Sequence, residues 1–105
     1  MKFSIDNIRI FPIQSPDGIV AFASAIINGG MYVGSIAIHE KKDQSGYRIT
    51  YPTRKSKGKD LNIFHPISQE CSQIIEDSII TEYLKYAKTV NNARYDNSHT
   101  PDPSL

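Results

Sequence analysis

Two apolar runs on either side of a short turn sequence restrict the fold of this chain more than any other feature. The first run covers residues 19–27, the second covers residues 31–38, and Asn28-Gly29-Gly30 stands between them. Asparagine and glycine accept the positive φ angles that a tight hairpin turn requires, whereas β-branched residues do not. The pattern therefore predicts an antiparallel β-hairpin at the centre of the fold.

Further strands are predicted on both sides of this hairpin. A first strand is expected within residues 3–13, before the turn sequence at 15–18. A polar bridge leads to another strand over residues 47–51, which Pro52 ends because proline cannot donate to a β-ladder. Residues 62–64 are expected to add a short fifth strand.

A single helix is predicted to follow, over residues 68–88. Ser68 suits the N-cap, and Glu70 in the first turn complements the helix dipole. Its apolar stripe consists of Cys71, Ile75, Ile79, Tyr83 and Tyr86, with Ile74 on one side and Ile80, Leu84 and Ala87 on the other. A helix that covers one sheet needs a stripe of only roughly 100°. The wider arc fits either a second subunit or a helix held deeply within one chain.

The predicted fold class is therefore α+β: an antiparallel β-meander of four to five strands followed by one long C-terminal helix. Residues 1–88 are expected to form one domain, because 105 residues suffice for a single core. Residues 89–105 are polar and contain two prolines, so we expect a disordered, flexible tail.

Composition also indicates the compartment. The single Cys71 cannot form an internal disulfide, and the amino terminus lacks the pattern of a signal peptide. No run approaches the roughly 18 apolar residues of a membrane span. We therefore expect a cytoplasmic protein without membrane contact.

Positive charge is concentrated in one short segment. Residues 52–59, PTRKSKGK, contain four cations and no carboxylate, although the whole chain has a formal net charge of only +1. A mobile cationic loop on a sheet suits an anionic polymer, because each Lys or Arg that meets a phosphate releases condensed counterions. A solvated loop that blocks aggregation at a sheet edge is the alternative, and charge alone favours it.

Three cations near the helix end extend the candidate surface. The nucleic-acid-binding candidates are Arg54, Lys55, Lys57, Lys59, Lys85, Lys88 and Arg94. Complementation of the helix dipole is the alternative role for Lys85 and Lys88. Tyr47 and Tyr51 share one face of their strand, where they either stack on bases or pack against the helix.

Other chemistry has little support. The three histidines and Cys71 form no pair with the spacing of metal ligands, so no metal or cofactor is expected. We instead expect His65 to hydrogen-bond at the corner between strand and helix. Neither a nucleophile elbow nor a P-loop is present, so we expect neither an enzyme nor a small-molecule substrate.

Two motifs resemble the SpoVG family (stage V sporulation protein G). They are YPTRK at residues 51–55 and IFHPI at residues 63–67, and the resemblance extends over residues 8–88. It implies a bacterial homodimer that binds nucleic acid and regulates septation and sporulation. The basic loop of the family carries over to Arg54 and Lys55, and less securely to the two following lysines. Ala37 stands where the family tends to place a basic residue.

The leading hypothesis is a dimeric, sequence-tolerant DNA- or RNA-binding regulator that grips phosphates through its basic loop. A protein–protein interaction module of a septation or regulatory pathway, without direct nucleic-acid binding, is the alternative.

Overall fold

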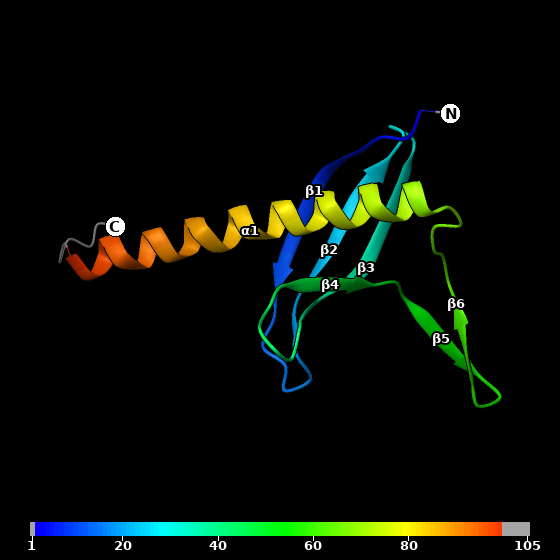
Figure 1. Cartoon of the computed structure of the whole chain (residues 1–105), viewed down its shortest axis with the longest axis horizontal. Coiled ribbons are helices and arrows are strands. Elements are labelled where there is room, and N and C mark those ends of the chain that lie inside the picture. Colours follow the sequence, from blue (N-terminus) through cyan, green and yellow to red (C-terminus); the bar gives the residue numbers. More distant parts are fainter. Residues whose placement is uncertain (1, 100–105) are drawn as a thin grey trace.

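The structure is a computed structural model that describes the backbone of residues 2–99 and the side chains of residues 2–90. Its elements are β1 (Ile5–Pro12), β2 (Ile19–Ile27), β3 (Met31–Glu40), β4 (Tyr47–Thr50), β5 (Thr53–Ser56), β6 (Lys59–Asn62) and α1 (Gln69–His99) (Figure 1). Strands β1 to β4 form an antiparallel meander in sequence order, and β5 pairs with β6 in a separate sheet. The predicted α+β class is confirmed.

The turn between β2 and β3 is the one that the Asn-Gly sequence predicts. Asn28 and Gly29 adopt φ angles of 51° and 69°, the left-handed values that this turn needs. The Asn28 side chain also holds the start of the chain, because its Oδ1 accepts a 2.8 Å hydrogen bond from the Ser4 backbone N–H. The central hairpin and the amino-terminal segment are therefore fastened together.

The core lies between α1 and one face of the four-stranded sheet, which the helix crosses in Figure 1. On β2, beneath the helix, Ala21, Ala23 and Ala25 are each at most 1% exposed. Their methyl groups leave room for larger side chains from the helix, of which Ile75 and Ile79 are buried. The Ala-rich strand thus allows the helix to pack closely on the sheet.

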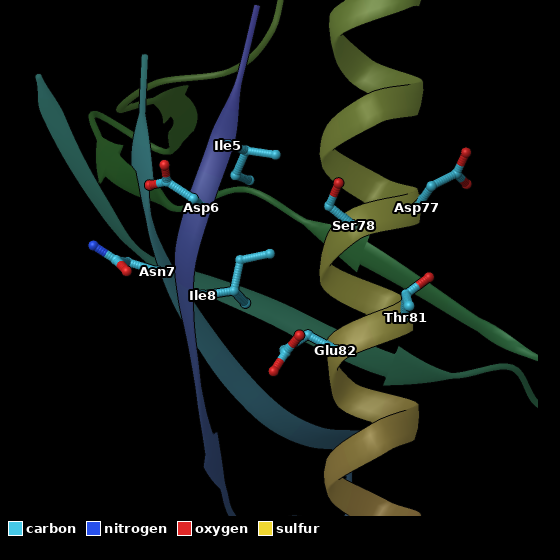
Figure 2. Close-up of a pocket in the computed structure, with 8 residues that line it drawn as sticks. All are labelled: Ile5, Asp6, Asn7, Ile8, Asp77, Ser78, Thr81 and Glu82. Carbon is cyan, nitrogen blue, oxygen red and sulfur yellow. The ribbon is translucent and has the colours of Figure 1, made fainter. Parts of the chain in front are cut away.

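Two β-bulges keep the apolar side chains on the helix side. Asn7 in β1 and Ser35 in β3 have φ angles of 50° and 60° and lie where the strand registers shift. An extra residue reverses the alternation of the strand. As a result, Ile5 and Ile8 both point toward α1, as Figure 2 shows.

The start of α1 agrees with the prediction. The Cys71 backbone N–H donates to Ser68 Oγ at 3.1 Å, which confirms the N-cap. Just before it, the His65 ring lies with Nδ1 2.9 Å from the carbonyl oxygen of Pro66, the corner hydrogen bond expected of this histidine.

The end of α1 differs from the prediction. The helix continues to His99 instead of ending near Lys88. The sequence contains no proline or glycine between Ser68 and Pro101, and polarity alone does not stop a helix. Residues 100–105 of the expected tail lie outside the described residues. No helix in the described part of the chain has the length and apolarity needed to cross a membrane.

Candidate nucleic-acid interface

The basic segment, which was expected to be a mobile loop, forms a β-hairpin. Strands β5 and β6 are joined by Lys57 and Gly58, whose φ angles of 52° and 79° are typical of a type I′ turn. The fifth strand was expected over residues 62–64, but β6 ends at Asn62 and has its own partner strand. Residues 53–62, called the arm below, project from the body of the molecule in Figure 1.

The register of the arm sorts its charged side chains onto two faces. Arg54 pairs with Leu61, Lys55 with Asp60, and Ser56 with Lys59. Paired residues of an antiparallel ladder share a face, and successive residues alternate between faces.

Arg54 and Lys59 therefore lie on one face, the arginine face, together with Ser56 and Leu61. Lys55 lies on the other face, directly opposite Asp60. All four arm cations are exposed, with Lys57 at the tip. Among the four, Lys55 is the one that the register places directly opposite a carboxylate, that of Asp60.

The root of the arm is anchored to the core. The rings of Tyr51 and Phe64 meet edge to face, with centroids 5.9 Å apart and an interplanar angle of 72°. The Ile63 backbone N–H donates to the Pro52 carbonyl oxygen at 3.0 Å and continues the ladder to the root. The root is thus held by aromatic packing while the tip reaches outward.

The hydroxyl of Tyr51 is buried at this root and has no hydrogen-bond partner among the described residues. Loss of solvation, and after it the charge of Glu76, raises the pKa of Tyr51 to about 12. The side chain is therefore a structural element and not an exposed stacking surface.

Tyr47 likewise faces the helix. Its ring packs edge to face on Tyr83, with centroids 5.1 Å apart. Burial raises the pKa of Tyr83, with the neighbouring Tyr47 as a smaller cause. The packing alternative is confirmed for both strand tyrosines, and neither is available for bases.

The structure does not bring the helix cations to the arm. Lys85 and Lys88 are exposed and belong to the carboxyl-terminal half of α1. In Figure 1 the helix runs away from β5 and β6, so this half and the arm lie at opposite ends of the molecule. The side chain of Arg94 lies outside the described side chains. Of the candidate cations whose side chains the structure describes, the four in the arm lie together, and Lys85 and Lys88 lie apart from them.

A groove between β1 and α1 has the opposite character (Figure 2). It is lined by Ile5, Asp6, Asn7, Ile8, Asp77, Ser78, Thr81 and Glu82. Its carboxylates do not converge, since Asp6 points away from α1 and Asp77 points away from β1. Among the residues that the structure describes, no group of three or more His, Cys, Asp or Glu is arranged to hold a metal ion. These carboxylates would repel phosphate, so the groove is an unsuitable path for an anionic polymer.

Sequence reasoning missed the hairpin and the role of Asp60 within it. The signal was present, because Lys57-Gly58 is a two-residue turn candidate between two short polar runs. Asp60 directly follows the cationic segment 52–59. Only the register reveals that it faces Lys55.

Comparison with known proteins gives a consistent family match. The family model described as SpoVG matches residues 3–85, which include the sheet, the arm and the first half of α1. Relatives named "Putative septation protein SpoVG" include one from Phytoplasma australiense, 33% identical over 89 residues that cover 84% of this chain and 88% of that protein. Another, from Bdellovibrio bacteriovorus, is 28% identical over 87 residues, or 82% of this chain and 78% of its own length.

Proposed function

The chain belongs to the SpoVG family, and from this we propose that it is a dimeric regulator that binds the phosphates of DNA or RNA through the arm. The observation that carries the proposal is the exposed cationic hairpin that projects from an otherwise nearly neutral chain. Contacts to phosphates position a protein but do not read sequence, so binding is sequence-tolerant. Its setting is the cytoplasm, in control of septation or sporulation.

The form of the arm supports this proposal. A two-stranded β-ribbon fits the major groove of duplex DNA, and the turn at its tip can follow a single strand as well. Arg54 and Lys59 lie diagonally across the ribbon on one face, with Lys57 at the tip. We therefore assign the leading phosphate contacts to these three residues and a minor contact to Lys55.

Exposed apolar side chains in a groove beside the arm root support the dimer. Ile67 is 94% exposed and Met31 is 58% exposed. Both border an apolar groove whose lining includes Val33, Phe64 and Ile75. A second copy that covers this groove removes the exposed apolar area from water and presents the arm twice.

The test is binding of short DNA and RNA duplexes at several salt concentrations, measured by fluorescence anisotropy. If a dimer neutralises six phosphates, log K falls with log salt at a slope of about −5. We expect Arg54→Ala with Lys59→Ala to weaken binding to every sequence and to flatten the slope to about −2. Lys55→Ala should retain most of the affinity.

Lys41→Ala with Lys42→Ala is the matched control. It removes the same charge from the exposed turn between β3 and β4. Affinity should change much less than in the arm variant. An equal loss in the two double variants would show that net charge, and not the arm, drives binding.

A protein-interaction module is the second candidate, because the apolar groove beside Ile67 could hold a partner protein. This candidate requires that the wild-type chain leave DNA and RNA unretarded in low salt while it captures a protein partner.

A further inference from the structure

The face of the four-stranded sheet that α1 leaves uncovered has two exposed aromatic rings. Their strand neighbours Ile10 and Val33 pack in the core, so alternation places Phe11 and Tyr32 on the opposite face. Phe11 is 50% exposed and Tyr32 is 67% exposed. These rings are outside both the core and the arm.

A shallow groove on this face joins the two rings. Its lining includes Asn7, Arg9, Phe11, Ser24 and Tyr32. The register orders these residues in rows, in which Phe11 pairs with Phe22, Arg9 with Ser24, and Ile26 with Tyr32. Arg9 therefore lies between the two aromatic rows.

Gly34 sets the position of the Tyr32 ring. A Cβ atom at Gly34 would lie 3.0 Å from Tyr32 Oη and 3.1 Å from its Cε2. The absence of that atom lets the ring lie down along β3. A side chain at position 34 would push the ring out of this position.

The charge of this face favours an anion. Arg9 and Arg48 are both exposed on it, and Asp6 is the carboxylate that the described register places there. His39, opposite Arg48, lies with Nε2 2.8 Å from Thr50 Oγ1. Asp77 and Glu82 belong to α1, which covers the other face of the sheet.

We propose that this face binds single-stranded nucleic acid, with bases stacked on Phe11 and Tyr32 and phosphates held by Arg9 and Arg48. The inference rests on the proposed function and adds to it a substrate class and a second contact surface. Aromatic side chains on a sheet stack on bases without regard to sequence, because every base has a π face. A duplex keeps its bases stacked internally, so it cannot use these rings.

The test compares a fluorescent oligothymidylate with a duplex of equal length. Phe11→Leu with Tyr32→Leu keeps apolar side chains of similar size on the strands and removes the rings. We expect this variant to lose about tenfold or more in affinity for the single strand and to bind the duplex as the wild type does. Ile13→Leu, at an exposed apolar residue just beyond the end of β1, is the control and should bind both as before.

A conservative variant guards against a loss of folding. Phe11→Tyr with Tyr32→Phe retains both rings, and its single-strand affinity should stay within about twofold of wild type. Equal single-strand affinity of the leucine variant and the wild type would overturn the inference. So would capture of a protein through these rings with no change in oligothymidylate affinity.

The outcomes separate this inference from the function on which it rests. If the arm variant loses duplex binding while the leucine variant keeps its single-strand affinity, the arm binds nucleic acid and the uncovered face of the sheet, called the open face, does not. If the leucine variant alone loses affinity, the open face binds nucleic acid and the arm does not. A wild-type chain that binds neither probe contradicts both.

Discussion

At the scale of single residues, the four cations that look equivalent in the sequence differ in their surroundings. Asp60 lies opposite Lys55 on one face of the arm, whereas Arg54 lies opposite Leu61 on the other. An opposite charge across a ladder stabilises the ribbon modestly, and it also lowers the field that a phosphate meets. Under the proposed function, we therefore expect Lys55 to contribute more to the arm's structure and Arg54 to contribute more to binding.

Tyr51 offers a test of the arm root. Its buried hydroxyl has no partner among the described residues, and an unsatisfied buried polar group costs stability. We expect Tyr51→Phe to raise the free energy of unfolding at neutral pH by about 1 kcal/mol, measured by urea unfolding. Tyr32→Phe, which removes an exposed hydroxyl, should leave it unchanged. A loss of stability in Tyr51→Phe would show that this hydroxyl has a partner in solution.

The same variant should alter the response to alkali. The pKa of Tyr51 rises from 10.0 to about 12 in the folded chain. Between these values the unfolded chain loses the proton and the folded chain retains it, so stability falls as pH rises. Tyr51→Phe should reduce this fall and not abolish it, because the pKa of Tyr83 is raised as well.

At the scale of elements, the sequence correctly predicted turns and caps that depend on the preferences of a few neighbouring residues. The turn at Asn28-Gly29 and the cap at Ser68 follow from the preferences of the residues themselves, and both are confirmed. The arm was missed because its strands are polar and its turn has Lys57 where asparagine is usual. The end of α1 was missed because nothing before Pro101 breaks a helix.

The candidate surfaces were harder to predict than the elements, because they depend on register. The bulge at Asn7 reverses the alternation within β1, so the face that Phe11 occupies cannot be counted from the start of the strand. The bulge at Ser35 has the same effect in β3. The pairing of Lys55 with Asp60 needs the position of the turn as well.

Gly58 tests whether the shape of the arm matters in addition to its charge. Gly58 has a φ of 79° and open space around its missing Cβ, so Gly58→Ala introduces backbone strain and no clash. The strain costs about 1 kcal/mol, which should open the turn while all four cations remain. We expect faster amide hydrogen exchange in the arm and weaker binding of nucleic acid, with little change in global stability.

Gly29→Ala is the matched control for this experiment. It introduces the same kind of strain at a φ of 69°, again without a clash, but in the central hairpin. It should lower global stability and leave the exchange rates of the arm and the affinity unchanged. Normal binding by Gly58→Ala with a demonstrably opened arm would mean that charge suffices without shape.

At the scale of the whole molecule, the near-neutral total conceals an uneven distribution. The arm is cationic, Glu82 lies in the groove between β1 and α1, and the uncovered face of the sheet presents Arg9 and Arg48 together with Asp6. Under the proposed function, we expect a nucleic acid to follow the arm and the uncovered face of the sheet and to avoid the groove. Since Lys85 and Lys88 lie far from the arm in one chain, they join a continuous track only if a second copy supplies the neighbouring arm.

Two apolar surfaces are candidates for the dimer interface, and a mutation in each one can distinguish them. One is the groove beside Ile67, which is 94% exposed, and the other is the flank of α1 at Leu84, which is 47% exposed. Because both side chains are already accessible in one chain, an aspartate at either position costs the monomer little and disrupts a contact that buries it.

We expect Ile67→Asp to reduce the mass measured by light scattering from twice 11.8 kDa to 11.8 kDa, and Leu84→Asp to leave it at twice that value. The monomeric variant should also show a flatter salt dependence of binding, because it presents one arm instead of two. The reverse result would place the interface on the helix flank, and the wide apolar arc of α1 would then be explained by a neighbouring subunit. A wild-type chain that already measures as 11.8 kDa at high concentration would exclude the dimer and require that a single arm and a single open face account for all binding.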